Sequence, residues 1–307
     1  MDINKILKEA YEYAKPYTKE GKLVDYLPEL AKADINNLGA VVIDGDANLY
    51  KIGAYNEKFS IMSIVKVVLY LIVLENYKAD EIKNYLLMKN TYNPYNSLLD
   101  LENGEGKKPV NPFVNAGAIV TSYLINKKFA DKSIDVILEK TRQIMNDDSI
   151  DYSREIVDTS MDKADTNFAL AYTLKKNKII SQDTDVYNLL KLYCMACAII
   201  IDAEDLAVFS SVLARDGKNL KGDQVIERDH ARILRTLMAT CGTYDYSMEF
   251  ALEIGLAAKS GVGGGILAAN RQIGIGIYSP GLDIRGNSLA SIEFLKYFSK
   301  KLDLSIY

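Results

Sequence analysis

The segments with strand character lie near the two ends of the chain, and the long stretch between them has a helical pattern. Residues 38–43 and 49–52 are short β-favouring runs joined by Asp44-Gly45-Asp46, which predicts a hairpin. Glycine-bounded strands follow much later, at 264–269 and 273–278. Strands this far apart in sequence share one sheet only when the two ends of the chain meet, so this distribution constrains the fold strongly.

Helical patterns flank and separate these strands. An amphipathic helix is expected at 3–19, a closing helix at about 288–302, and mostly helical structure from 63 to about 235. Loops are expected around 93–111 and 147–152. We therefore predict an α+β fold, in which an antiparallel sheet built from both chain ends is flanked by the first and last helices.

The central helices then form a second lobe, and a cleft separates it from the sheet. We expect residues 1–307 to be a single catalytic unit. Its sheet lobe is expected to comprise 1–62 and 236–307, and its helical lobe 63–235.

Composition narrows the class of protein. The chain has 307 residues, 49% hydrophobic and 25% charged, with a net charge of −4, which suits a soluble globular domain of ordinary size. No basic block is present, so we expect no nucleic-acid partner. The N-terminal residues do not resemble a signal peptide, and the longest apolar stretch, 64–74, is interrupted by Lys66 and too short to span a bilayer. We expect a cytoplasmic protein without a membrane partner.

Histidine and cysteine are too scarce for several common active sites. The one histidine, His230, lies in a charged segment that reads as a solvated helix start. Triads or zinc sites that need histidine are therefore disfavoured, and we expect no metal and no cofactor. Cys194 and Cys197 have C-x-x-C spacing but apolar flanks, and with Cys241 they are expected to be buried, reduced thiols that catalysis does not need.

Ser63 and Lys66 stand three residues apart at the start of the apolar run. If this run is a helix, both side chains lie on one face, one turn apart. The helix N-terminus favours an oxyanion there, and an amine kept neutral by burial can accept the serine proton. Chance occurrences of Ser-x-x-Lys are frequent, but this is also the arrangement of serine β-lactamases and penicillin-binding proteins.

Further elements follow in the order expected for such enzymes. Lys259-Ser260-Gly261 is a variant of their Lys-Thr-Gly element and is expected to add positive charge to the cleft, although a plain glycine turn is the alternative. Asn115 follows an X-Pro turn, where it either caps a helix or projects into the cleft. Tyr244 follows a glycine and is either a core residue or part of the cleft rim.

The series of motifs resembles the glutaminase family from about residue 20 to 295. The matching segments are 26–31 (YLPELA), 59–67 (FSIMSIVKV), 111–118 (NPFVNAGA), 241–245 (CGTYD), 259–265 (KSGVGGG) and 286–290 (GNSLA). The resemblance implies a serine-β-lactamase-like fold and the hydrolysis of L-glutamine to L-glutamate and ammonia through an acyl-serine, without a cofactor. We also expect a homodimer or homotetramer.

The resemblance also implies roles for individual residues. Ser63 is the expected nucleophile, Lys66 its activating partner, and Tyr193 a second group in proton transfer. The backbone N–H of Val262, together with that of Ser63, is expected to form an oxyanion hole. The remaining expected substrate-binding positions are Asn115, Ser160, Asn167, Tyr244 and Lys259.

Two positions depart from the family pattern. Met62 stands where the family usually has glutamine, and Ser160 stands where it usually has a glutamate that is expected to hold the substrate α-ammonium. Glu155 or Asp162 is a candidate to replace that carboxylate. The alternatives are a non-catalytic binding protein, an amidohydrolase of altered specificity, and a β-lactam- or peptide-directed enzyme. Intact Ser63 and Lys66 oppose the first.

Overall fold

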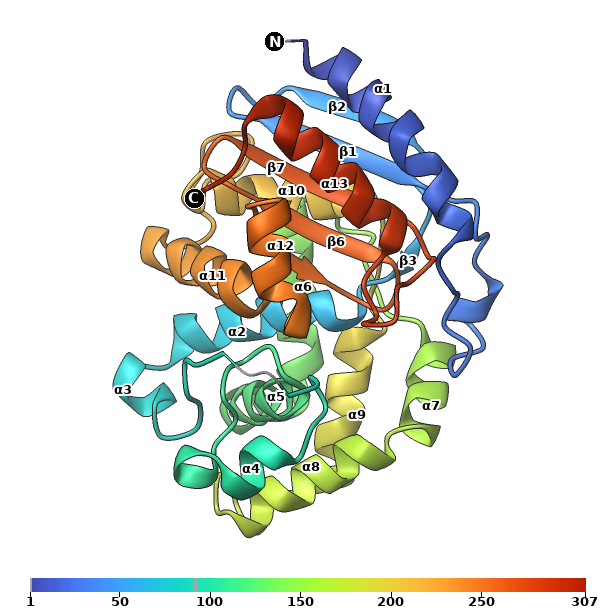
Figure 1. Ribbon diagram of the computed structural model, residues 1–307. Coiled ribbons are helices and arrows are strands. Elements are labelled where there is room, and N and C mark those ends of the chain that lie inside the picture. The colour runs from blue at the N-terminus through green and yellow to red at the C-terminus, as the bar shows by residue number, and fades with distance from the viewer. Residues whose placement is uncertain (1, 91–92) are drawn as a thin grey trace.

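One antiparallel sheet connects the two ends of the chain. The computed structural model describes residues 2–90 and 93–307. The sheet has the strand order β2-β1-β7-β6-β5 and confirms the predicted α+β class (Figure 1). The central pairing joins β1 to β7, with Gly39 opposite Tyr278 and Asp44 opposite Ile273. The strands are β1 (Gly39–Asp44), β2 (Leu49–Gly53), β5 (Ala257–Ser260), β6 (Gly265–Ala269) and β7 (Ile273–Tyr278), and a separate pair comprises β3 (Phe59–Ser60) and β4 (Ile200–Ile201).

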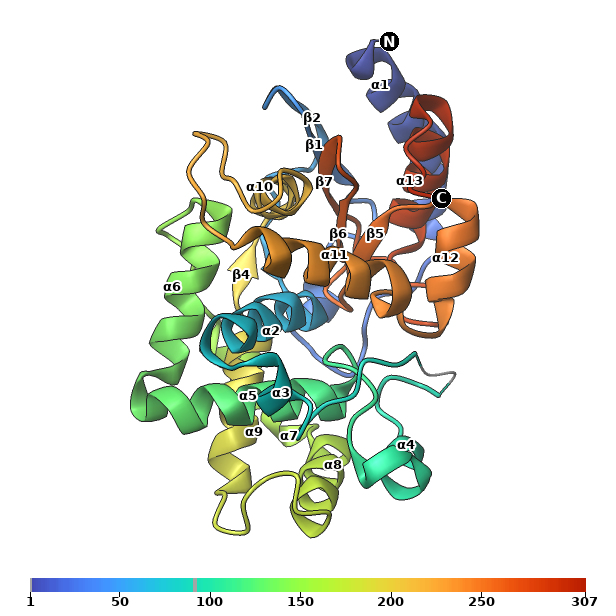
Figure 2. The same ribbon diagram turned by 90° about the vertical axis from the view of Figure 1, so that its left-hand side faces the viewer.

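Helices cover both faces of the sheet. Figure 2 shows the sheet nearly edge-on, with α10 on one side and with α1 and α13 on the other. The helices are α1 (Ile3–Ala14), α2 (Val65–Asn76), α3 (Ala79–Ile82), α4 (Leu99–Asn103), α5 (Asn115–Phe129), α6 (Ser133–Met145), α7 (Arg154–Asp162), α8 (Asp165–Lys176), α9 (Val186–Cys197), α10 (Ala203–Ala214), α11 (Arg228–Cys241), α12 (Ser247–Glu253) and α13 (Leu289–Leu302).

The two faces of the sheet contact different hydrophobic clusters, because successive side chains of β1 point to opposite faces. Ala40 and Val42 belong to the hydrophobic cluster that contains the buried residues of α1 and α13. Val41 and Ile43 belong to the larger cluster that contains α10 and the central helices. A Cβ at Gly276 of β7 would lie 2.1 Å from the carbonyl oxygen of Ala203, so glycine is what lets α10 lie directly on the sheet.

Below the sheet lie α2, α3, α4, α5, α7, α8 and α9 (Figure 1). Every residue of α2 from Val65 to Val73 is buried, which explains its nearly continuous apolar sequence. Ser63 therefore stands where the chain passes from the sheet lobe into the core of the helical lobe. No helix in the described part of the chain is long and apolar enough to cross a membrane. The division into a sheet lobe, 1–62 with 236–307, and a helical lobe, 63–235, stays a prediction. Helix α10 falls within 63–235 but packs on the sheet.

Local differences from the expected elements have simple causes. The first helix is α-helical only to Ala14 and continues as a 3₁₀ turn, Lys15–Lys19, because Pro16 offers no N–H to extend the α-helical ladder. The short strands β3, β4 and β5 carry too little pattern to be recognised in the sequence. The loop expected at 93–111 contains α4 and a 3₁₀ turn, Glu105–Lys107.

Candidate active site

Ser63 lies in a 3₁₀ turn, Met62–Ile64, that leads directly into α2. Met62 has a left-handed backbone with φ of 45°, a conformation that costs a non-glycine residue about 1–3 kcal/mol and is concentrated at functional sites. Ser63 is half-buried and lines a pocket of about 300 Å³. The pocket is lined by Tyr26, Leu27, Met62, Ser63, Tyr95, Asn96, Asn115, Ser160, Lys163, Thr166, Asn167, Tyr193, Cys194, Cys197 and Val262.

Lys66 is completely buried one turn after Ser63. Its Nζ donates to the carbonyl oxygen of Phe113 at 3.0 Å and to Oδ1 of Asn115 at 2.7 Å. Burial lowers the pKa of Lys66 to about 7, because removing the ammonium from water disfavours the charged form. A large fraction of Lys66 is therefore neutral near pH 7, as a base for the Ser63 proton requires.

A second buried lysine lies behind the pocket. Lys259 donates to the carbonyl oxygen of Ser260 at 2.7 Å, and its Nζ lies 4.0 Å from the centre of the Tyr244 ring. Burial, and then the charge of Lys66, hold the pKa of Lys259 well below its ordinary value. Burial is the largest cause of the lowered pKa at both lysines.

Tyr244 stands between the two lysines. The centre of its ring lies 5.7 Å from Nζ of Lys66, and its hydroxyl donates to the carbonyl oxygen of Ser260 at 3.4 Å. Burial raises the pKa of Tyr244, and a side-chain hydrogen bond with Ser63 opposes that increase. Tyr244 and Lys259 are both absent from the described lining of the pocket, and Tyr244 is connected to it through the hydrogen bond with Ser63.

Tyr193 lines the pocket from α9. Burial raises the pKa of its phenol well above the ordinary value, so Tyr193 stays protonated and is suited to donate a hydrogen bond or a proton. A side-chain hydrogen bond joins Tyr193 to Cys197, one turn later, and Cys197 also interacts with Lys66. Burial raises the pKa of Cys197 to about 11, which keeps it a thiol. The three cysteines are buried, as expected, but Cys194 and Cys197 line the pocket.

Asn115 is the first residue of α5 and connects Lys66 to Asn167 by hydrogen bonds. Its Oδ1 accepts from Lys66, and its Nδ2 donates to Oδ1 of Asn167 at 3.0 Å. The amide therefore faces the pocket, whereas Asn111 performs the local turn by accepting from the backbone N–H of Phe113. The structure thus brings Asn115 and Asn167, 52 residues apart, into one polar wall.

A glycine-rich turn after β5 places the backbone of Val262 at the pocket. A Cβ at Gly261 would lie 3.3 Å from the backbone N of Ser63, and one at Gly263 would lie 2.1 Å from the carbonyl oxygen of Ser60. Glycines are needed here because two backbone segments meet without side chains between them. Within the described residues, no group accepts a hydrogen bond from the Val262 N–H, so this donor is available to a ligand.

Ser160 lies on α7 and contributes an unsatisfied hydroxyl to the pocket. Its Oγ is buried and has no hydrogen-bond partner among the described residues. Glu155 and Asp162, the carboxylates proposed from the sequence to compensate, are absent from the described lining. Another carboxylate, Glu29, accepts from Oγ1 of the adjacent Thr159 at 2.8 Å.

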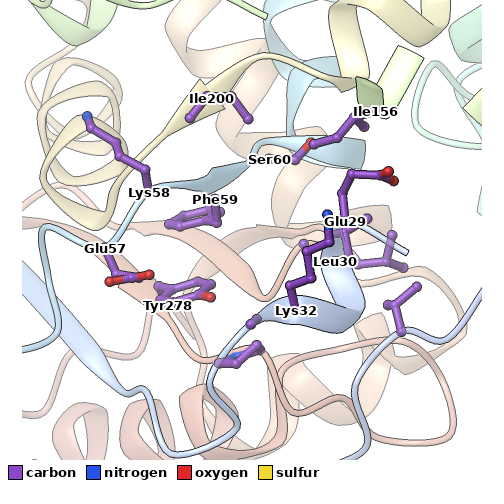
Figure 3. A pocket seen from close by; sticks show the side chains of 15 residues that line it. Glu29, Leu30, Lys32, Glu57, Lys58, Phe59, Ser60, Ile156, Ile200 and Tyr278 are labelled. Carbon is purple, nitrogen blue, oxygen red and sulfur yellow. The ribbon is translucent and has the colours of Figure 1, made fainter. Parts of the chain in front are cut away.

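Glu29 belongs to a neighbouring cavity of about 230 Å³, which is shown in Figure 3. Its labelled walls include Lys32, Glu57 and Lys58, and Val262 lines both this cavity and the Ser63 pocket. Charged groups are thus concentrated in the cavity beside the pocket, while the pocket itself is mostly neutral.

Two tyrosines of the site were not singled out from the sequence. Tyr26 is 48% exposed at the pocket mouth, and its place in the YLPELA segment was the available signal. Tyr95 packs its ring 4.7 Å from that of Tyr244, and its carbonyl accepts from the backbone N–H of Asn115 at 2.8 Å. No signal distinguished Tyr95, because the chain has 21 tyrosines. His230, in the first turn of α11, is not among the lining residues.

Known proteins share this fold over its full length. The glutaminase family model matches residues 21–307. The chain is 41% identical over 308 residues to glutaminase 2 of Clostridium perfringens, covering 99% of this chain and 100% of that protein. It is 39% identical over 307 residues to a Clostridium botulinum glutaminase, with the same coverage.

Solved structures of glutaminases have the same fold as this chain. The Bacillus subtilis glutaminase in its covalent complex with 5-oxo-L-norleucine superposes with a TM-score of 0.86 at 29% identity, covering 100% of both chains. A probable glutaminase superposes with a TM-score of 0.93 at 28% identity, covering 100% of this chain and 99% of that one.

The sheet built from both chain ends, the helical lobe and the pocket at the start of α2 define an enzyme of the serine-β-lactamase-like fold, a hydrolase. Within that class, the chain belongs to the glutaminase family.

Proposed function

We propose that the protein hydrolyses the side-chain amide of L-glutamine to L-glutamate and ammonia through an acyl-serine formed on Ser63. One observation carries this proposal. Lys66 is fully buried one turn from Ser63, with a pKa of about 7, at a pocket large enough for an amino acid. Such a lysine is a base at physiological pH, which an ordinary surface lysine is not.

Acylation begins when neutral Lys66 takes the Ser63 proton as Oγ attacks the amide carbon. The carbonyl oxygen becomes an oxyanion, which the N–H groups of Val262 and Ser63 stabilise. Each such donor contributes about 2.7–4 kcal/mol to the transition state. The C–N bond then breaks, and the departing nitrogen receives a proton from the Lys66 ammonium, either directly or through the Tyr193 hydroxyl, which Lys66 reprotonates.

Deacylation repeats these steps with water. Lys66 takes a proton from the water as its oxygen attacks the ester carbon, and the same two N–H groups stabilise the second oxyanion. Collapse breaks the bond to Ser63, whose oxygen recovers its proton from Lys66. One water is consumed, and one carboxylate and one ammonia are released.

Asn115, Asn167 and Ser160 line the pocket and are the proposed substrate-binding side chains. The amides of Asn115 and Asn167 are suited to hold the substrate carboxylate. Tyr244 orients Ser63 through their side-chain hydrogen bond. Lys259 lies against the Tyr244 ring and acts on the site by holding that ring in place.

The proposed chemistry uses side chains and backbone N–H groups and needs no metal or cofactor. We also propose a cytoplasmic location, which three free thiols suit. A homodimer or homotetramer is supported by exposed apolar residues near the C-terminus, among them Leu252, 80% exposed, and Tyr307, 72% exposed.

The decisive test combines a variant with a chemical label. Ser63→Ala should abolish ammonia release from glutamine while keeping the thermal stability of the wild type, because one hydroxyl is removed. A diazoketone analogue of glutamine, 6-diazo-5-oxo-L-norleucine, should add one adduct to the wild type, located by peptide mass spectrometry at Ser63. Turnover by Ser63→Ala, or an adduct at another residue, would refute the acyl-serine mechanism.

A second candidate is an amidohydrolase of altered specificity, and the unsatisfied hydroxyl of Ser160 is the observation that favours it.

A further inference from the structure

The cavity beside the Ser63 pocket, here called the Glu29 cavity, contains charged groups of both signs. Its volume is about 230 Å³, against about 300 Å³ for the Ser63 pocket, so it has room for a small amino acid. Glu29 and Lys32 lie on one side of it, and Glu57 and Lys58 lie on the other (Figure 3). None of these four side chains has a role in the proposed hydrolysis.

Three of the four charged side chains have no charged partner. Lys58 is already paired with two aspartates, at 2.9 and 3.2 Å. Glu29, Lys32 and Glu57, in contrast, form no ion pair within the described part of the chain. Two carboxylates and one ammonium group are therefore available to a ligand. A zwitterion, which carries one charge of each sign, is the complement of such a set.

The hydroxyl of Tyr278 is a further group without a partner. Tyr278 is only 2% exposed, lines the Glu29 cavity and stacks on Phe59 with ring centres 4.3 Å apart. No described residue exchanges a hydrogen bond with its hydroxyl, which points toward the side of the cavity that carries Lys32 (Figure 3). Burial, and then the charge of Glu57, raise the pKa of Tyr278 and keep it protonated. Buried tyrosines usually have a hydrogen-bond partner, so this donor is suited to a ligand oxygen.

The inner wall of the Glu29 cavity is apolar. Leu30, Phe59, Ile156 and Ile200 line it, and Phe59 and Ile156 are each only 6% exposed. A hydrocarbon group that packs on this wall leaves water, which favours binding. An inorganic ion or a purely polar molecule would contact the charged side chains and leave the wall unused.

We propose that the Glu29 cavity binds a free α-amino acid with an apolar side chain, at a site separate from that of the substrate. The two carboxylates attract the ligand ammonium, Lys32 and Tyr278 donate to its carboxylate, and its side chain packs on the apolar wall. Val262 lines both the Glu29 cavity and the Ser63 pocket. The ligand therefore contacts the residue whose backbone N–H is the proposed oxyanion donor.

Titration calorimetry of the wild-type protein with L-leucine tests the site. We expect saturable binding in the millimolar range. Three matched probes should bind about tenfold more weakly: 4-methylpentanoate, which lacks the ammonium, 3-methylbutylamine, which lacks the carboxylate, and glycine, which lacks the side chain. No binding of L-leucine, or equal binding of any of the three probes, would overturn the proposal.

Variants locate the bound amino acid. Tyr278→Phe removes only the unpartnered hydroxyl, so it should keep the Tm of the wild type and weaken L-leucine binding about fivefold. Lys32→Gln and Glu57→Gln should each weaken it by a similar factor. Lys163→Gln is the matched control, because it removes a charge from the Ser63 pocket instead, and should leave L-leucine binding unchanged. Loss of binding in Lys163→Gln but not in Lys32→Gln would refute the proposal.

Ammonia release from glutamine provides an independent check. L-Leucine at a concentration that saturates the Glu29 cavity should not raise the KM for glutamine. Competitive inhibition would place L-leucine in the Ser63 pocket and overturn the separate site. Calorimetry needs no turnover, so a failure of the proposed hydrolysis would leave the binding result intact.

Discussion

The hydrogen bond between Asn115 and Lys66 offers a way to move the pKa of Lys66, the proposed base. Asn115→Asp keeps the size of the side chain and its acceptor oxygen, which lies 2.7 Å from Nζ, and adds a negative charge. An opposite charge at this distance favours the ammonium and shifts a pKa by about 1–3 units. The acid limb of kcat/KM should therefore move from near pH 7, the pKa of Lys66, to about pH 8–10.

The size of the effect follows from the fraction of neutral Lys66. In the wild type, about half of Lys66 is neutral at pH 7 and about a tenth at pH 6. With a pKa near 9, only about 1% is neutral at pH 7, so kcat/KM falls about fiftyfold there and recovers near pH 10.

Ammonia release from glutamine, measured from pH 5 to 10, provides the assay. Asn167→Asp is the matched control, because the same charge is added one hydrogen bond farther from Nζ and should shift the limb less. If Asn115→Asp retains measurable turnover and the acid limb of its kcat/KM profile is unchanged, Lys66 is not the titrating base.

Three further predictions concern the surroundings of the base. Cys197→Ala removes a hydrogen-bond partner of Tyr193, worth about 1 kcal/mol, and should lower kcat about fivefold, while Cys241→Ala should leave kcat near that of the wild type. Ser160→Glu should raise kcat/KM for glutamine and Met62→Gln in the same chain should raise it further, and an unchanged or lower value in the double variant would show that these positions do not limit glutamine use. A chelator should leave turnover unchanged, and loss that added zinc restores would contradict the proposed chemistry.

Sequence periodicity predicted the sheet and its outer helices because those elements carry strong, local patterns. It failed at β5, where Ala257–Ser260 contains no β-branched residue and includes Lys259. The Ser260 carbonyl and the Tyr244 ring receive Nζ of this buried lysine, and both contacts depend on the folded chain. Periodicity also could not place α10 on the sheet, since a buried helix has the same pattern in either lobe.

The same limit applies to the site. The spacing of Ser63 and Lys66 was sufficient to predict their shared face, because three residues in a helical turn determine it. The residues that surround Lys66 and Tyr193 and shift their pKa values come from distant segments of the chain. Cys197 on α9 beside Lys66, and the absence of a carboxylate from the lining, became visible only in three dimensions.

Lys66 should reduce the stability that the fold would otherwise have. Its pKa is about 7 in the folded protein, against an ordinary value of 10.5, so the unfolded chain binds the proton more tightly. Stability therefore rises with pH between about 7 and 10.5, and the full penalty applies below pH 7. At 1.36 kcal/mol per pH unit, that penalty is about 4–5 kcal/mol.

Lys66→Met removes the charge while keeping a long, flexible side chain in the core. We predict a higher Tm at pH 6, by an amount corresponding to about 1–4 kcal/mol once the lost bonds to Phe113 and Asn115 are subtracted. The gain should shrink at pH 10, and turnover should be abolished at both values. An equal or lower Tm at pH 6, measured by calorimetry, would show that burying Lys66 carries no cost. A higher Tm with lost turnover would identify Lys66 as a residue kept for chemistry at the expense of stability.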